Sequence, residues 1–141
     1  MMLVPTYLAP SPIEGLGVFT RVPIRKGELV WRFDRTFDQV LAVADIAAAP
    51  EHIREFMDRY TYPLPGAPET HVVLDADEGR FMNHADAPNC EFPPDGETGW
   101  ALRDIAAGEE LTCHYACFSV GDVAFQPPRH AVHAVAASPA E

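Results

Sequence analysis

The order of apolar and polar residues along the chain predicts several short strands interrupted by one helical region. Residues 18–22 and 29–33 are rich in β-formers and flank a turn at Gly27. Further short apolar runs, separated by Gly and Pro turns, predict strands at these ranges: 71–74, 90–92, 100–103 and 111–114. Short strands with one helical insert are typical of a mostly β, α+β domain.

The helical region is residues 38–62. Pro50 followed by Glu51 is a favourable helix start, since proline suits the first turn and an acid there suits the helix dipole. Apolar residues then recur at helical spacing and predict a face packed in the core: Ile53, Phe56, Met57 and Tyr60. Alanines predict a shorter helix at 45–49. Three prolines end the region at 63, 65 and 68.

The pattern Ile-x-x-Gly-Glu occurs twice, starting at Ile24 and at Ile105, each time between two β-rich runs. One interpretation is a repeated structural unit. The other is two unrelated turns that both need glycine for a positive φ.

Composition favours one soluble domain, since the 141 residues are 48% hydrophobic and 22% charged. The net charge is −11, and between residues 75 and 110 ten acidic residues stand against two arginines. Such a surface repels nucleic-acid phosphates and attracts a basic partner, although it could serve solubility alone. We expect no direct nucleic-acid binding. No apolar run approaches the ~20 residues that span a membrane, so no membrane is expected either.

Cys90, Cys113 and Cys117 form neither an even disulfide set nor a zinc-finger spacing, which favours a reducing, cytoplasmic setting. The first residues lack the basic start of a signal peptide. Pro5, Pro10 and Pro12 predict an extended N-terminal arm over 1–11. Residues 129–141 are rich in Ala, His and Pro without a period, and we expect a mobile tail.

Three segments carry the candidate chemistry. They are GLGVF at 15–19, RFMNHADAPNC at 80–90 and ALRDIAAGEELTCHY at 101–115. The first resembles the G-x-G-(V/L)-F opening of SET domains. The second resembles their R-F-I-N-H-S-x-x-P-N-C segment, and the third resembles their A-x-R-D-I-x-x-G-E-E-L-T-x-x-Y closing segment. A lone G-x-G is weak evidence, but the second and third segments in this order and spacing are specific.

The resemblance implies a fold of small curved sheets tied by a pseudoknot, with a SET-like domain at 12–118 and a closing segment at 119–128. It implies transfer of a methyl group from S-adenosylmethionine to a lysine of a basic, Lys/Arg-rich protein. The alternative within the family is a silent module that binds cofactor or a basic peptide without turnover.

The resemblance also implies the site residues. Those matching cofactor-binding positions are Gly15, Leu16, Gly17, Arg80, Phe81, Asn83, His84, Tyr115 and Phe118. Asn83 would bond the amino-acid end of the cofactor, and the backbone of His84 would meet the adenine. Tyr115 would carry catalysis, because a phenol can orient the amine and stabilise the polarised methyl group.

A lysine channel would be lined by Phe33, Phe92 and Cys113, and Phe118 or Phe125 would close it. Cys113 is smaller than the aromatic residue common at its position, which would leave room for an already methylated lysine. Packing in the core is the alternative role of each of these side chains.

The sequence departs from the family at three places. Ala85-Asp86 replaces Ser-Cys, His114 replaces Asp before the tyrosine, and no C-x-C-x4-C run follows Tyr115. The resemblance therefore implies no cysteine-rich zinc site, and we expect no metal. A metal hydrolase could be imagined from His84, Asp86 and His114 with a cysteine, but no pair has H-E-x-x-H or C-x-x-C spacing.

Overall fold

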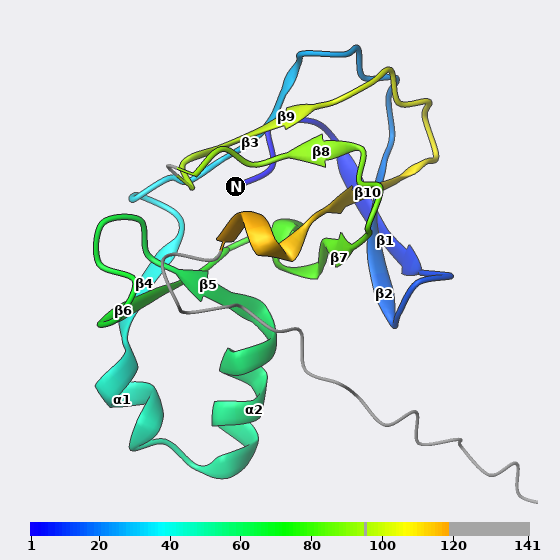
Figure 1. Cartoon of the computed structure of the whole chain (residues 1–141). Coiled ribbons are helices and arrows are strands. Elements are labelled where there is room, and N and C mark those ends of the chain that lie inside the picture. Colours follow the sequence, from blue (N-terminus) through cyan, green and yellow to red (C-terminus); the bar gives the residue numbers. More distant parts are fainter. Residues whose placement is uncertain (95, 119–141) are drawn as a thin grey trace, which may run out of the picture.

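The computed structural model describes residues 1–94 and 96–118, whose strands form three small sheets (Figure 1). The first sheet has the order β1 (Thr6–Pro10), β2 (Leu16–Thr20), β10 (Glu110–Cys113) and β7 (Asn83–His84). The second has the order β3 (Leu29–Arg32), β9 (Thr98–Ala101) and β8 (Cys90–Glu91). The third has the order β4 (Gln39–Ala42), β6 (His71–Leu74) and β5 (Thr61–Pro63). The predicted mostly β, α+β class is confirmed.

Four short helices complete the described chain: α1 (Val43–Ala47), α2 (Glu51–Tyr60) and the 3₁₀ turns η1 (Glu78–Phe81) and η2 (Tyr115–Phe118). In the described part, no helix has the length and apolar character that crossing a membrane requires. The predicted closing segment 119–128, Phe125, the tail 129–141 and the side chain of Phe118 lie outside the described residues.

Strand β10 lies in the middle of its sheet, antiparallel to β2 and parallel to β7. Leu111 pairs with Val18, and Thr112 pairs with Asn83. The last strand is thus inserted between two earlier ones, as the implied pseudoknot requires. This insertion brings the segments 15–19, 80–90 and 101–115 together.

The repeated Ile-x-x-Gly-Glu pattern forms two structurally equivalent units. Ile24 and Ile105 pair through two backbone hydrogen bonds of 2.9 and 2.8 Å. Gly27 and Gly108 both have positive φ, 83° and 86°, and each donates a 2.8 Å bond to the strand end of the other unit. The two turns are therefore related and pack against one another.

The same turns explain why the predicted bounds of two strands lie two residues too late in the sequence. The strands predicted at 18–22 and 100–103 form at 16–20 and 98–101. In both units the chain must leave the sheet early enough to bend back toward the isoleucine pair. The β-forming residues Val22 and Leu102 therefore lie in the bends.

The core lies between the first two sheets, and its fully buried side chains come from both units: Val18, Ile24, Val30, Ile105 and Leu111. Burying each of these aliphatic side chains stabilises the fold by about 1.5–3 kcal/mol. Two of these five side chains, Ile24 and Ile105, come from the repeated pattern. The repeat therefore contributes to the core as well as to backbone pairing.

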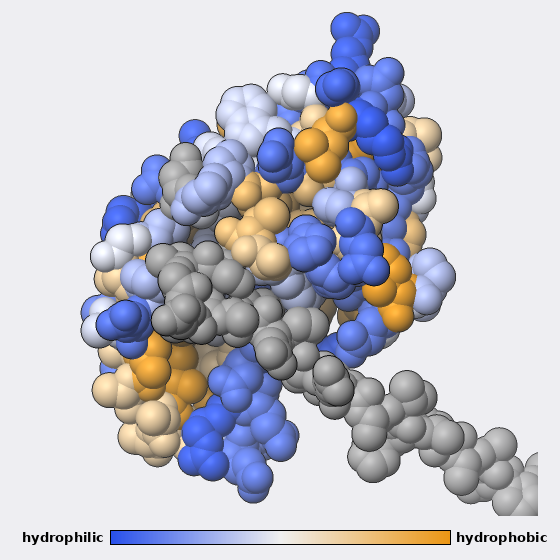
Figure 2. Space-filling model, in the orientation of Figure 1, coloured by the Kyte–Doolittle hydropathy of each residue, from blue (hydrophilic) through white to orange (hydrophobic). Residues whose placement is uncertain are grey.

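The prediction that one face of α2 lies in the core is wrong. No residue of α2 is buried, and Ile53 and Phe56 are 37% and 38% exposed. The helix contacts α1, and at its end the Tyr60 ring lies 5.2 Å from that of Phe81. The insert projects from the sheets in Figure 1, and hydrophobic surface lies over its α1 end at the lower left of Figure 2.

The helical insert begins and ends with short strands, β4 and β5, which the sequence pattern did not predict because both are short and prolines lie nearby. β4 and β5 enclose β6 from both sides, so the insert is anchored as a three-stranded sheet. The N-terminal arm is extended as expected, and its residues 6–10 form the edge strand β1.

Candidate active site

A polar cavity of about 390 Å³ lies between the loop before β2 and the turn η1. Six of the predicted cofactor-binding residues line it: Gly15, Leu16, Arg80, Phe81, Asn83 and Tyr115. Three residues that no motif indicated complete the lining: Glu14, Arg59 and Tyr60. Arg59 and Tyr60 come from the end of α2, so the helical insert supplies one wall of this cavity.

Asn83 ties the glycine loop to the inserted strand. Its Nδ2 lies 3.1 Å from the backbone oxygens of both Glu14 and Leu16, and 2.8 Å from Oε1 of Glu110. Among the described residues, all hydrogen bonds of this side chain use Nδ2, with the amide orientation assigned from that network. The carbonyl Oδ1 is therefore the atom of Asn83 that can accept a bond from a ligand.

Gly17 and His84 belong to the same assembly but do not line the cavity. A Cβ atom on Gly17 would lie 2.2 Å from Oε1 of Glu110, so this glycine permits close packing of β2 against the Glu110 side chain. His84 accepts a 3.1 Å hydrogen bond at Nδ1 from the backbone N–H of Tyr115. These two residues therefore support residues that line the cavity without lining it themselves.

Asn89 fixes the inserted strand from the other side. Its Oδ1 accepts a 2.8 Å bond from the N–H of Thr112, and its Nδ2 donates a 2.7 Å bond to the carbonyl of Glu110. The Asn89 side chain is buried with both ends bonded to β10. The P-N-C part of the second motif therefore holds the strand that carries Tyr115.

A second, narrow cavity of about 60 Å³ adjoins the first and is mostly apolar. Phe92 and Cys113 line it as predicted for a lysine channel, together with Trp31 and Tyr62, which sequence reasoning missed. Phe33 does not line it; it packs at the edge of the core beneath the Arg35 guanidinium. The rings of Tyr62 and Phe92 lie 5.7 and 5.4 Å from that of Trp31.

Tyr115 stands in the wall that the two cavities share. Strand β10 ends at Cys113, so Tyr115 opens the 3₁₀ turn η2. Its hydroxyl donates a 2.9 Å hydrogen bond to the carbonyl of Met82. Arg59, Tyr60 and Arg80 also line both cavities.

Burial raises the pKa of two side chains that line the narrow cavity, Tyr115 and Cys113. Burial and then the neighbouring Cys113 raise the pKa of Tyr115, so the phenol acts as a dipole rather than as a phenolate base. Burial likewise raises the pKa of the Cys113 thiol well above its usual value. A buried neutral thiol is a poor nucleophile and a poor metal ligand.

Among the described residues that line the narrow cavity, Asp75 alone carries a carboxyl group. Its Oδ2 accepts a 2.9 Å bond from Nε1 of Trp31, and burial raises its pKa to about 6. A Cβ atom on Gly79 would lie 2.6 Å from the same oxygen, so the glycine makes room for this pair.

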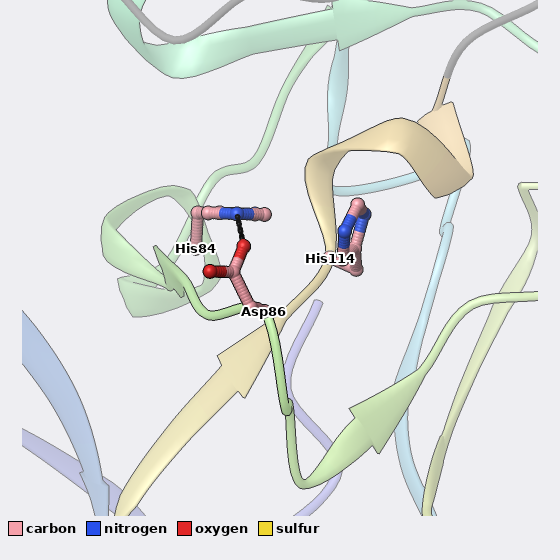
Figure 3. A group of neighbouring side chains, drawn as sticks. All are labelled: His84, Asp86 and His114. Carbon is pink, nitrogen blue, oxygen red and sulfur yellow. Dashed lines mark hydrogen bonds and ion pairs between the residues drawn. The ribbon is translucent and has the colours of Figure 1, made fainter.

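His84, Asp86 and His114 form a cluster whose ligand atoms lie within 4.8 Å of one another (Figure 3). In both histidines Nδ1 accepts a backbone N–H, from Tyr115 and from Ala116. A neutral imidazole with Nδ1 as acceptor carries its proton on Nε2, which in His84 lies 3.2 Å from Oδ1 of Asp86. With the tautomers assigned from this network, both histidines bind backbone N–H groups of η2 and so support that turn.

Comparisons with known proteins identify the family of the chain. The family model described as SET domain matches residues 15–116. The histone-lysine N-methyltransferases, H3 lysine-36 specific, of Mus musculus and Homo sapiens are each 34% identical over an alignment of 120 residues, which covers 77% of this chain and 4% of the relative. The histone-lysine N-methyltransferase ATX2 of Arabidopsis thaliana is 29% identical over 124 residues, covering 79% of this chain and 11% of that protein. The chain thus spans only a small part of these relatives.

Solved structures share the fold. One is ctPRC2 in an autoinhibited conformation bound to S-adenosylmethionine, with 26% identity, a TM-score of 0.59 and coverage of 82% of this chain and 15% of that chain. Another, from Plasmodium falciparum, has 21% identity and a TM-score of 0.58, covering 81% of this chain and 95% of that chain. Since the matched residues 15–116 include all three segments that the inserted strand joins, the chain belongs to the SET-domain family.

Proposed function

We propose that this chain is a protein-lysine methyltransferase that uses S-adenosylmethionine and acts on a basic protein. The observation that carries the proposal is the position of Tyr115 between the polar cavity and the narrow apolar one. A methyl transferase of this kind needs a donor and an acceptor that approach in line from two sides, with a dipole at the meeting point. Two cavities that share the Tyr115 phenol support this arrangement.

The polar cavity fits the cofactor. Its volume of about 390 Å³ suits a small-molecule site, which typically measures roughly 300–1,000 Å³. Nε of Arg80 is buried and has no hydrogen-bond partner among the described groups, and Oδ1 of Asn83 is available to a ligand. When bound, S-adenosylmethionine supplies a methyl group activated by a sulfonium.

The residues of the chain position the acceptor. Trp31 and Phe92 form apolar walls along which the methylenes of a lysine side chain can pack while water is excluded. The neutral Tyr115 hydroxyl orients the amine lone pair toward the polar cavity. The small Cys113 side chain leaves space for a lysine that already carries a methyl group.

The substrate class follows from charge. The ten acidic residues between 75 and 110 favour a Lys/Arg-rich segment, and the relatives bear the names of histone-lysine methyltransferases. We include in the proposal that the protein works in the cytoplasm without direct contact to nucleic acid. Its three free cysteines support a reducing setting.

The test is incubation with methyl-labelled S-adenosylmethionine and a panel of histones and Lys-rich peptides, followed by mass spectrometry of the modified residue. We expect label on a lysine ε-amine, and no label when Tyr115→Phe replaces the wild type. Cofactor binding by calorimetry without any transfer would instead identify a silent module. Label on another residue type would refute the proposed reaction.

A further inference from the structure

The first two backbone N–H groups of η2 both donate to histidine side chains. The N–H of Tyr115 lies 3.1 Å from Nδ1 of His84, and the N–H of Ala116 lies 3.2 Å from Nδ1 of His114. N–H groups at the start of a helical turn have no partner within the turn and need an acceptor from outside it. The two imidazoles supply these acceptors and so fix where the turn begins.

Tyr115 is therefore held at both of its ends. Its hydroxyl donates to the carbonyl of Met82 at 2.9 Å, and its backbone donates to His84, whose ring lies 5.3 Å from the phenol ring. A displacement of about 1 Å at a reacting centre can lower a rate by ~10². The backbone bonds of η2 thus bear on the rate as well as on folding.

His114 makes a bond that an aspartate or asparagine could also make. It accepts the N–H of the residue two positions further on, which is the geometry of an Asx turn. Nδ1 of histidine and Oδ1 of Asp or Asn are both attached to Cγ, so they reach the same point. The SET-domain pattern has Asp at this position, and this chain changes only the type of atom that accepts the bond.

The change of acceptor makes the bond depend on protonation. An imidazole gains a proton on its acceptor nitrogen between roughly pH 8 and pH 5, whereas an aspartate or asparagine side chain remains an acceptor throughout that range. Once Nδ1 is protonated, two N–H groups point at one another and the bond is lost. The His84 side chain is 32% exposed, so protons reach it from the solvent.

The titratable groups that face the two rings have opposite effects (Figure 3). Oδ1 of Asp86 lies 3.2 Å from Nε2 of His84, and this carboxylate favours the charged imidazole. The ring centroids of His84 and His114 are 4.7 Å apart, so a charge on one ring opposes a charge on the other. Tyr115 and Cys113, which pairs with His84, stay neutral because burial raises the pKa of each.

Resting on the proposed function, we propose that His84 and His114 are positioning residues for Tyr115, and that methyl transfer requires both imidazoles to be uncharged. Protonation of either ring releases an N–H of η2. The turn then shifts, and the Tyr115 hydroxyl leaves the wall between the two cavities. Acidification thereby stops transfer through the support of the phenol, in addition to its effect on the substrate amine.

The first test compares rates across pH. Single-turnover transfer to a basic peptide is followed at saturating cofactor from about pH 8.5 to about pH 5.5, the range over which imidazole changes charge. Dividing the rate of each variant by that of the wild type at the same pH removes the titration of the substrate amine. All rates are taken at a temperature at which circular dichroism shows every variant folded.

Three variants carry this test. The double variant His84→Asn with His114→Asn keeps both acceptors, so its rate ratio should rise on acidification by up to about tenfold per pH unit for each proton avoided. His114→Ala removes one acceptor at every pH and should be ~10–100-fold slower than wild type even at about pH 8.5. His52→Asn is the matched control, because His52 is exposed on α2 and lines neither cavity. Its ratio should stay constant.

The second test does not depend on catalysis or on the double variant. In ¹H–¹⁵N NMR spectra of the chain without cofactor, the amide resonances of Tyr115 and Ala116 should move with the same pH dependence as the imidazole resonances of His84 and His114. Amides that stay in place while the imidazoles titrate would overturn the proposal.

Two rate results would also overturn it. One is a folded double variant whose ratio to wild type is constant across the pH range, and the other is a His114→Ala variant as fast as wild type at the alkaline end. A wild-type chain that transfers no methyl group at any pH would refute the proposed function itself. The NMR titration distinguishes that outcome, because it reports on the imidazole bonds alone.

Discussion

Replacing Tyr115 by Phe removes one hydroxyl from the wall between the two cavities and leaves the ring in place. The ring packs beside His84 at 5.3 Å, and the backbone N–H still bonds to Nδ1 of that histidine. The lost contact is the 2.9 Å hydrogen bond from the hydroxyl to the carbonyl of Met82. The perturbation is therefore confined to one dipole.

The structure sets different magnitudes for folding and for rate. One neutral hydrogen bond contributes about 0.5–1.5 kcal/mol, so the free energy of unfolding should fall by about 1 kcal/mol. A preorganised dipole at a reacting centre typically contributes ~10²–10³ in rate. If the hydroxyl acts chiefly in the transition state, the loss belongs in kcat, and cofactor affinity should change little.

The assay is single-turnover methyl transfer to a basic peptide at saturating cofactor, with calorimetry of S-adenosylhomocysteine binding and urea unfolding alongside. Tyr7→Phe is the control, since Tyr7 lies on β1, stacks on Phe19 and lines neither cavity. A Tyr115→Phe variant with near-normal kcat would refute the reasoning. So would a variant that loses cofactor binding or folding, because Tyr115 would then be structural.

Three further results are expected. Asn83→Ala should weaken cofactor binding by ~1.5–3 kcal/mol in calorimetry and also lower the melting temperature, because Nδ2 holds the backbone at Glu14 and Leu16; unchanged affinity in a folded variant would contradict the assignment. The kcat/KM for a Lys/Arg-rich peptide should fall as salt rises to physiological strength, and a flat profile would reduce the acidic stretch 75–110 to a solubility feature. Burial raises the pKa of Asp75 to about 6, above the ~3.9 of an unfolded chain, so its protonated form favours folding and the free energy of unfolding should fall, by at most ~3 kcal/mol, as pH rises from about 4 to about 6. Urea unfolding across that range should be flatter for Asp75→Asn, and an identical slope would contradict the burial argument.

The strands show how far local patterns reach. β-forming residues predicted where most strands occur, but the ends of two strands are set by the pairing of Ile24 with Ile105, which are 81 positions apart in the sequence. A local sequence pattern cannot predict a pairing between residues so far apart in the chain. Strands β4 and β5 were missed for a related reason, because each is short and becomes a strand only by pairing with β6.

The residues of the candidate site also include some that the sequence predicted and some that it did not. Motif residues such as Asn83 and Tyr115 were predicted because their types and order are specific, and the structure places both at the polar cavity. Trp31 was missed because an apolar residue inside a strand signals only burial. Ile53 and Phe56 were assigned to the core because helical spacing reveals a common face but not what that face meets.

The helical insert contributes residues to both cavities. Arg59 and Tyr60 end α2 and line both cavities, and the Tyr60 ring rests on Phe81 of the motif turn. A shift of α2 must therefore change the walls of the polar and the narrow cavity together. Because α2 has no buried residue, its docking on the sheets depends on few contacts, among them the Tyr60–Phe81 ring contact and the ion pair between Glu14 and Arg59. Weakening the helix end should thus alter cofactor affinity and peptide KM in parallel, whereas a change confined to the exposed residue Ile53 should alter neither through this route.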